Sequence, residues 1–277
     1  MAETVISETA LEAPLFQSRS SQIFSWSGNT LLKLFHEDIA PDLIRNEEIN
    51  TTEAFEKGIT KVKCYGQATL GGRTGLILEK VEGKTLIALT TSNPGMAFRI
   101  PHLMAELQIQ MHQTHTDKIR SYRQMVLDAL NSEPLSFLTE QEKAAAVSRI
   151  SRMPDGDSIL HLDYHPDNIM SDGKTATIID WMTAARGVPA ADVAATLYLL
   201  NEGEMIPGLN RVLAMVLEQV RRHICSKYYS AYKEKTGLTD AEVSEWRLPF
   251  LIVRLGVWNI KSEVDLLQQK IRAELNR

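Results

Sequence analysis

The chain has 277 residues, of which 44% are hydrophobic and 23% are charged, as is usual for soluble globular proteins. Its net charge of -5 and its pI near 5.9 argue against broad nucleic-acid binding, which requires a basic surface. Cys64 and Cys225 lack metal-site spacing, so we expect free thiols of a reducing compartment. The N-terminus is acidic and has no basic start of a secretion signal, and the most apolar stretch, LPFLIVRLGVW, is short and includes Arg254. We therefore expect a cytoplasmic protein without a membrane span.

The first part of the sequence is predicted to be rich in β-strands. The segments SQIFSW and TLLKLF are separated by a turn at Gly28 and Asn29 and have the spacing of a β-hairpin. A second hairpin is predicted between CYGQATL and RTGLILEKV, with Gly71 and Gly72 as the turn. Between the hairpins, APDLIRNEEINTTEAFEKGI is typical of a helix that ends at Gly58.

After VEGKTL the pattern becomes helical. Apolar residues recur at helical spacing at Ile100, Leu103, Leu107 and Met111. Thr239 and Glu242 have the spacing of a capping box at the start of a later helix. One β-strand, TATIIDW, follows the turn SDGK and interrupts the helices. The sequence thus predicts a small β-rich lobe over residues 1–82 and a larger helical lobe over residues 83–277.

The stretch HLDYHPDNIM, which begins at His161, concentrates polar residues between apolar ends. Alternating His161, Asp163 and His165 suit a metal cage in an extended segment, but no other His/Asp cluster supplies further ligands. Nucleophilic catalysis is disfavoured because the sequence has no G-x-S-x-G motif and Cys225 has no base at a recognisable spacing.

Phosphoryl transfer accounts for more of the pattern. This chemistry needs an aspartate at the acceptor hydroxyl, an asparagine and a second aspartate for Mg²⁺, and a lysine for the nucleotide phosphates. Asp163 and Asn168 are five positions apart, as in the kinase loop H-R-D-x-x-x-x-N. Asp180 follows an apolar strand, as the D-F-G aspartate does, and Lys33 lies in a strand that matches the V-A-I-K context.

These segments resemble the aminoglycoside phosphotransferase and choline kinase-like family of the protein-kinase-like superfamily. Its loop is similar to H-G-D-x-H-P-x-N-[IV]-[LM] and its metal strand to I-D-[WF], where this chain has HLDYHPDNIM and IIDW. The resemblance extends from SRSSQIF to VRLGVW, nearly the whole chain. It implies an α+β, bilobal protein-kinase-like fold with a small antiparallel-sheet N-lobe that binds the nucleotide. The larger helical C-lobe would then hold the catalytic loop and the acceptor site.

The resemblance also implies a role for each matching residue. Asp163 would be the catalytic aspartate that faces the acceptor hydroxyl, and Asn168 and Asp180 would hold Mg²⁺. Lys33 would contact the phosphates of ATP or GTP.

Further nucleotide contacts are implied in the N-lobe. A helix carboxylate would pair with the phosphate-binding lysine, with Glu47 preferred and Glu48 as the alternative. Ser20 and Ser21 would bind phosphate through their amides and hydroxyls. The backbone from Glu79 to Val81 would form the hinge that pairs with adenine.

Three positions need separate treatment. Ser18 and Leu162 both replace a glycine of the family pattern. A leucine is expected to tolerate only ordinary backbone angles, so either the local conformation or the acceptor-side wall should differ. Asp192 is expected either to cap the helix VAATLYLL or, by the resemblance, to brace the catalytic loop.

The predicted activity is a small-molecule kinase that phosphorylates a hydroxyl acceptor, and its rival is a nucleotide-binding regulator without transfer. A protein kinase is disfavoured because the segment from Asp180 to Asp192 is too short for an activation loop. Carboxylates in the C-terminal region would suit a cationic or amino-sugar acceptor but are more often solvated surface, namely Glu202, Glu204, Glu242 and Glu245.

Overall fold

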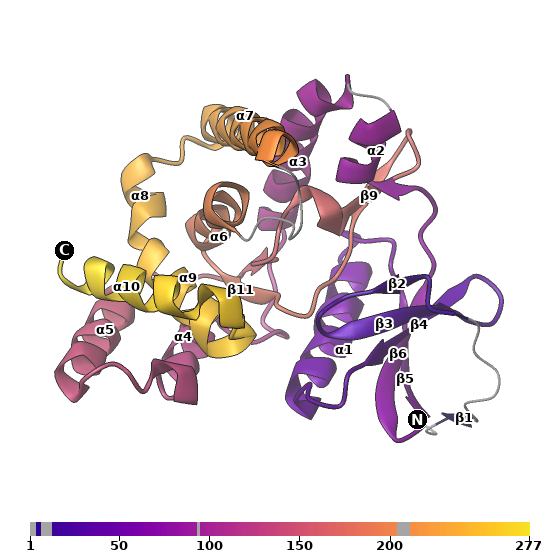
Figure 1. Cartoon of the computed structure of the whole chain (residues 1–277), viewed down its shortest axis with the longest axis horizontal. Helices are drawn as coiled ribbons and strands as arrows, with labels where there is room; N and C mark the ends of the chain where they lie inside the picture. Colours follow the sequence, from indigo (N-terminus) through magenta and orange to yellow (C-terminus); the bar gives the residue numbers. More distant parts are fainter. Residues whose placement is uncertain (1–3, 7–12, 93–94, 204–210) are drawn as a thin grey trace. The chain divides into compact units, whose positions relative to one another are not determined.

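The computed structural model describes residues 4–6, 13–92, 95–203 and 211–277, and it divides into two compact units (Figure 1). The N-terminal unit comprises residues 1–91 and 167–184, and the C-terminal unit comprises residues 92–166 and 185–277. The chain therefore returns to the N-terminal unit at Asp167, within the stretch HLDYHPDNIM. The functional assignment of residues 1–82 and 83–277 stays a prediction. No helix in the described part of the chain combines the length and apolarity needed to cross a membrane.

A six-stranded sheet forms the centre of the N-terminal unit. Its strand order is β1-β5-β6-β4-β3-β2, and every neighbouring pair is antiparallel except β1 with β5. The strands are β1 (Thr4–Ile6), β2 (Phe16–Gln17), β3 (Ser21–Ser25), β4 (Thr30–Phe35), β5 (Cys64–Leu70) and β6 (Arg73–Glu79). Both predicted hairpins are confirmed, since β3 pairs with β4 and β5 with β6. Gly71 and Gly72 both have positive φ, 56° and 77°, as a tight hairpin turn requires.

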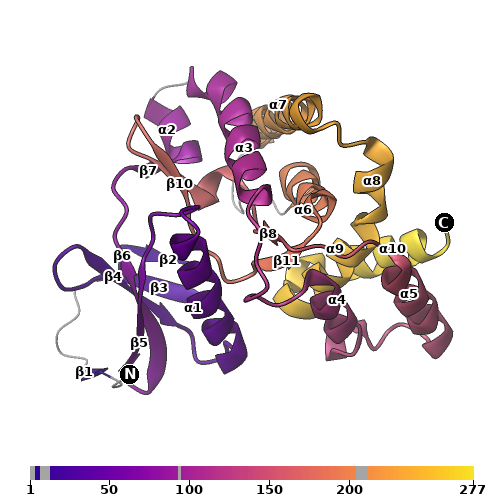
Figure 2. The same ribbon diagram turned by 180° about the vertical axis from the view of Figure 1, so that it is seen from behind.

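Helix α1 (Pro41–Glu56) lies against one face of this sheet (Figures 1 and 2). Proline at the first turn starts the helix, and Gly58, with a φ of 74°, follows its end as predicted. Ile44 of α1 packs against Phe35 and Leu76 of the sheet. The other apolar cluster of the sheet consists of Phe24, Leu32, Leu34, Ala68 and Leu70.

A three-stranded sheet of order β10-β9-β7 belongs to the same unit. It consists of β7 (Lys84–Thr85), which precedes helix α2 (Leu86–Ser92), and of β9 (Ile169–Ser171) and β10 (Ala176–Ile178). The strand predicted after the turn SDGK is therefore confirmed as β10, which pairs with β9. A Cβ on Gly83 would lie 2.2 Å from the carbonyl oxygen of Ser171, so β7 approaches β9 closely only because position 83 is glycine.

Among its described residues, the C-terminal unit has helices and one antiparallel pair of strands, β8 (Ser158–Leu160) and β11 (Ala185–Gly187). Its α3 and α7 run side by side (Figure 2), and the predicted capping box of Thr239 and Glu242 opens α8. The helices are α3 (Met96–His112), α4 (Tyr122–Leu130), α5 (Glu140–Arg152), α6 (Pro189–Glu202), α7 (Arg211–Thr236), α8 (Asp240–Glu245), α9 (Arg247–Val253) and α10 (Val264–Leu275). The predicted α+β fold class is confirmed.

The buried face of α3 differs from the predicted stripe. Leu103 and Leu107 are only half-buried, whereas the buried positions include Ile100, Met104, Gln108, Met111 and His112. The prediction placed only apolar residues on the buried face. The helix instead turns two polar side chains inward because both find hydrogen-bond partners there.

Candidate functional site

Lys33 is the central residue of a buried charge cluster in the N-terminal unit. Its Nζ lies 2.6 Å from Oε1 of Glu47 on α1 and 2.9 Å from Oδ1 of Asp180. Alternation along β4 explains this position, because Leu32 and Leu34 point into the opposite apolar cluster. Lys33 therefore points to the face that α1 covers. The carboxylate that contacts Lys33 is that of Glu47, while Glu48 accepts a hydrogen bond from Gln67 at 2.7 Å.

The charges in this cluster perturb one another. Burial by itself would lower the pKa of Lys33, but the charges of Asp180 and Glu47 outweigh it and raise that pKa above its ordinary value. Burial raises the pKa of Glu47 to about 7, although the ammonium of Lys33 acts in the opposite direction. Lys33 and Glu47 are enclosed, whereas the side chain of Asp180 is 38% exposed. Asp180 is therefore the most exposed member of the cluster.

The segment that contains Asp180 is held in an uncommon conformation. Asp180 has a φ of 64°, a left-handed value that is unusual for a residue other than glycine. The N–H of Ile179 donates to the carbonyl oxygen of Asn168 at 2.9 Å, so the two predicted metal ligands lie on neighbouring segments of one unit. Their side chains offer a carboxylate and an amide oxygen, and hard oxygen donors of this kind suit Mg²⁺.

Helix α1 and the loop after it anchor this segment. The amide of Asn50 donates to the carbonyl oxygens of Trp181 and Ala184, at 3.0 Å in each case. On the other side of Asp180, the hydroxyl of Thr60 donates to the carbonyl oxygen of Ile178 at 2.6 Å. These buried bonds fix the backbone on both sides of Asp180, which allows the strained residue to persist.

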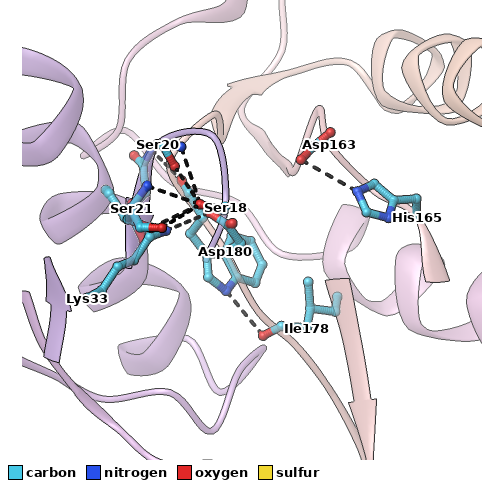
Figure 3. Close-up of polar contacts among 11 residues, drawn as sticks. Ser18, Ser20, Ser21, Lys33, Asp163, His165, Ile178 and Asp180 are labelled. Carbon is cyan, nitrogen blue, oxygen red and sulfur yellow. Dashed lines mark hydrogen bonds and ion pairs between the residues drawn. The ribbon is translucent and has the colours of Figure 1, made fainter. Parts of the chain in front are cut away.

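Of the two serines predicted to bind phosphate, Ser20 lies in the loop between β2 and β3, and Ser21 is the first residue of β3. The N–H groups of Ser20 and Ser21 both point at the hydroxyl oxygen of Ser18, at 3.3 and 3.1 Å (Figure 3). Their part in phosphate binding stays a prediction.

The predicted hinge follows β6. The N–H of Glu79 donates to the carbonyl oxygen of Lys63 at 2.8 Å, and its carboxylate accepts hydrogen bonds from Asn29 and from the hydroxyl of Tyr65. A pocket of about 420 Å³ borders this segment, and Glu79 and Val81 both line it. The segment thus has an open side within the N-terminal unit.

Asp163 belongs to the C-terminal unit and follows β8. Its Oδ2 lies 3.7 Å from Nε2 of His165 (Figure 3). Burial would raise the pKa of Asp163, but His165, His161 and Arg254 outweigh it and hold that pKa well below the usual range. Asp163 is therefore a carboxylate at neutral pH and can accept a hydrogen bond from a hydroxyl group.

Leu162, directly before Asp163, does not adopt ordinary backbone angles. Its φ is 64° and its side chain is fully buried, so the expectation that a leucine tolerates only ordinary backbone angles is wrong at this position. A left-handed residue other than glycine costs about 1–2 kcal/mol. The N–H of Leu162 donates to Oδ1 of Asp192 at 2.5 Å, and this charge-assisted bond helps to hold the conformation.

Asp192 braces the backbone directly before Asp163. It does not cap α6, because Val188 is the N-cap residue of that helix. Burial would raise the pKa of Asp192, but the hydrogen bond and charge of His112 and further interactions outweigh it and lower that pKa. Of the two interpretations from the sequence, the structure supports bracing.

Two residues of this brace were not predicted. Nε2 of Gln108 donates to Oδ2 of Asp192 at 2.8 Å, and Nε2 of His112 lies 3.0 Å from the same oxygen. Nδ1 of His112 lies 2.6 Å from the hydroxyl of Tyr232, which links α3 to α7. The available signal was the spacing of Gln108 and His112, four residues apart on the buried face of one helix.

Two of the carboxylates considered for a cationic acceptor, Glu202 and Glu242, have other partners. Glu202 contacts Arg247 at 2.6 Å and Lys270 at 2.8 Å. Burial opposes the shift, but these two residues lower the pKa of Glu202 to about 2. Glu242 belongs to the capping box of α8, and Glu204 lies outside the described residues. The ion pairs of Glu202 therefore favour a structural role for that carboxylate.

The alternative chemistries find little support. Within the described ranges, no group of three or more His, Cys, Asp or Glu side chains is arranged to hold a metal ion. Cys64 and Cys225 are free thiols, and burial raises the pKa of each to about 11. A thiol with so high a pKa is a poor nucleophile at neutral pH.

Comparison with known proteins identifies the class to which this fold and cluster belong. The sequence profile of the phosphotransferase enzyme family (APH) matches residues 19–220. The match covers well over half of the chain, and the chain therefore belongs to this family, as the motifs predicted. No curated protein sequence matches the chain.

Several solved structures share the fold. A thermostable mutant of the aminoglycoside phosphotransferase APH(4)-Ia, in its apo form, superimposes with a TM-score of 0.62 and 14% identity, over 97% of this chain and 94% of that chain. An aminoglycoside-3'-phosphotransferase of type VIII gives 0.58 and 15%, over 84% and 88% of the two chains. The amicoumacin kinase hAmiN, in complex with AMP-PNP, Ca²⁺ and Ami, gives 0.57 and 12%, over 99% and 90%. The protein thus has the kinase-like fold of this phosphotransferase family.

Proposed function

We propose that the protein transfers the γ-phosphoryl group of ATP or GTP to a hydroxyl of a small acceptor, either cationic or sugar-like. The observation that carries this proposal is the ammonium of Lys33 between the carboxylates of Glu47 and Asp180. Two solved structures with a similar fold support a nucleotide and a small molecule as the two substrates. One is the APH(4)-Ia mutant in a ternary complex with ADP and hygromycin B, and the other is hAmiN with AMP-PNP. We also propose that the protein acts in the cytoplasm and has no nucleic-acid partner.

The nucleotide is assigned to the N-terminal unit. Lys33 offsets charge on the triphosphate, and Glu47 holds that ammonium in place from α1. The loop that contains Ser20 and Ser21 covers the phosphates, and the backbone from Glu79 to Val81 pairs with the base. Each of these contacts uses either a cation or a backbone polar group, the two kinds of group that proteins commonly offer to nucleotides.

Asn168 and Asp180 are the proposed ligands of Mg²⁺. A bound magnesium ion would neutralise charge on the β- and γ-phosphates. Lys33 already holds one oxygen of Asp180, which positions the side chain, while the exposed part of Asp180 remains accessible.

Asp163 is the proposed partner of the acceptor hydroxyl. In the reaction, the hydroxyl oxygen forms a bond to the γ-phosphorus while the bond from that phosphorus to the bridging oxygen breaks and the nucleoside diphosphate leaves. The hydroxyl proton moves to Asp163. Because the low pKa of Asp163 makes it a weak base, its main contribution is to orient the nucleophile, and the proton moves late.

The first experiment is a thermal-shift titration with ATP and GTP, each with and without magnesium. We expect stabilisation that depends on magnesium for at least one nucleotide. A coupled turnover screen against pooled amino sugars, choline-like alcohols and simple sugars then identifies the acceptor class. No stabilisation by either nucleotide would refute the proposal.

Two substitutions separate the proposed roles. Asp163→Asn should lower turnover by about 10²-fold or more and leave nucleotide affinity nearly unchanged, because it removes only the group that faces the hydroxyl. Asp180→Asn should instead weaken binding of the magnesium–nucleotide complex. Equal losses of turnover and nucleotide affinity in Asp163→Asn would contradict its assignment. Glu48→Ala is the control, since Glu48 contacts Gln67 and not Lys33.

A nucleotide-binding regulator without transfer is the second candidate. It is favoured by one observation, the hydroxyl of Ser18 at the two amides that are assigned to phosphate. Magnesium-dependent stabilisation without turnover in any acceptor pool would favour this candidate.

A further inference from the structure

The Ser18 hydroxyl forms hydrogen bonds with the backbone amides that are assigned to the phosphates. Its oxygen accepts hydrogen bonds from the N–H groups of Ser20 and Ser21 at 3.3 and 3.1 Å, and its proton can be donated to the carbonyl oxygen of Ser21 at 3.1 Å (Figure 3). The same oxygen also lies 3.3 Å from the hydroxyl oxygen of Ser20 and 3.2 Å from that of Ser21. A hydroxyl group has one donor and two acceptor positions, so each of them has a partner here. The two amides therefore already have an acceptor in the nucleotide-free chain.

The rest of the loop holds the Ser18 hydroxyl at this place. The N–H of Ser18 donates to the carbonyl oxygen of Ser21 at 2.8 Å, and Nε2 of His36 lies 3.2 Å from the carbonyl oxygen of Ser18. The backbone of the turn is thus fixed at both ends by bonds that do not involve the hydroxyl. Rotation of the Ser18 side chain about its Cα–Cβ bond would move the oxygen away without breaking them.

We infer that the Ser18 hydroxyl occupies the position of a phosphate oxygen and must be displaced when a nucleotide binds. This inference rests on the proposed function, which assigns the loop to the nucleotide phosphates. A phosphate oxygen is charged and forms stronger hydrogen bonds to N–H groups than a neutral hydroxyl does, so the exchange is favourable. The binding free energy is reduced, however, by the two bonds that the hydroxyl gives up. Ser18 is therefore a specificity-determining residue that weakens binding of the phosphate groups and leaves binding of the nucleoside unaffected.

The test compares three single substitutions in the full chain. Ser18→Ala removes the hydroxyl and keeps the backbone, Ser18→Thr keeps a hydroxyl at the same position, and Ser25→Ala removes an exposed hydroxyl at the far end of β3 as a matched control. The dissociation constants of magnesium–ADP and of adenosine are measured by calorimetry. Thermal unfolding without ligand shows whether each variant is folded.

We expect Ser18→Ala to bind magnesium–ADP about 3- to 10-fold more tightly than the wild type, the effect of about one net hydrogen bond. Its affinity for adenosine should be unchanged, because adenosine has no phosphate. Ser18→Thr and Ser25→Ala should behave as the wild type does. A merely structural role of Ser18 would alter the affinities for ADP and adenosine together.

The outcomes separate this inference from the proposed function. If the wild type binds ADP and Ser18→Ala binds it equally or more weakly, the inference is overturned and the proposed function stands. If no variant binds ADP, the proposed function is overturned and the inference with it. Binding of ADP by Ser18→Ala but not by the wild type would support both.

Discussion

The two adjacent glutamates of α1 allow a controlled test of the Lys33 cluster. Glu47 contacts the buried ammonium of Lys33 at 2.6 Å, whereas Glu48 accepts a hydrogen bond from Gln67 at a more exposed position. Glu47→Ala and Glu48→Ala change the same residue type on neighbouring positions of one helix. Their effects on helix propensity are therefore similar, and the difference between them reports the tertiary contacts.

The expected magnitudes follow from burial. Removal of one partner of a buried ion pair costs about 3–5 kcal/mol, and Glu47→Ala should lie at the lower end, about 3 kcal/mol, because Asp180 remains 2.9 Å from the Lys33 ammonium. Loss of the hydrogen bond between Glu48 and Gln67 should cost about 0.5 kcal/mol. With a slope of about 2 kcal/mol per molar urea, Glu47→Ala should lower the unfolding midpoint by about 1.5 M.

Urea unfolding followed by tryptophan fluorescence measures both variants, since Trp26 and Trp181 both lie in the N-terminal unit. The slope with denaturant should be unchanged, so that the shift in midpoint reports stability alone. Equal losses for the two variants, or a larger loss for Glu48→Ala, would refute the argument that the buried contact of Lys33 with Glu47 stabilises this unit.

Two further predictions test the backbone around the site. Gly83→Ala should destabilise the protein by about 3 kcal/mol or more, since its Cβ would lie 2.2 Å from the carbonyl oxygen of Ser171. Gly173→Ala is the control, because no atom lies within 4 Å of its Cβ. It should cost only the strain of a positive φ, about 1–2 kcal/mol. Similar losses of unfolding free energy in the two variants would contradict the close approach. Asp192→Asn should destabilise the protein by about 2–3 kcal/mol at neutral pH. The pKa of Asp192 is lower in the folded protein than its ordinary value of 3.8, so its stabilisation is present above that pH and is lost as the pH falls through the folded pKa. The unfolding free energy of the variant should therefore decrease less than that of the wild type as the pH is lowered.

Much of the N-terminal unit could be predicted because its signals are local. Glycine-containing turns set both hairpins, and alternation in TLLKLF places Leu32 and Leu34 on one face and Lys33 on the other. The turn SDGK likewise defined the hairpin of β9 and β10. Turn chemistry and period-two alternation act over a few residues, which is why the sequence alone reveals them.

The brace in the C-terminal unit could not be predicted in the same way. Gln108 and His112 look like polar interruptions of a helix, and only their contacts with Asp192, some 80 residues later, explain why they are buried. The left-handed conformation of Leu162 depends on the same carboxylate. Helix packing determines which face of α3 is buried, and helix periodicity alone placed Leu103 and Leu107 on that face.

The sequence by itself determined the strand and helix order, the family motif and the set of residue types that phosphoryl transfer requires, because each depends on spacing within a short segment. The tertiary structure determined which of these residues contact one another. It selected Glu47 over Glu48 as the contact of Lys33 and brought Asp180 to the same ammonium across 147 positions of sequence. It also placed the Ser18 hydroxyl at the amides of the β2–β3 loop. Burial and charge act through distance in space, so these choices become visible only when the chain is folded.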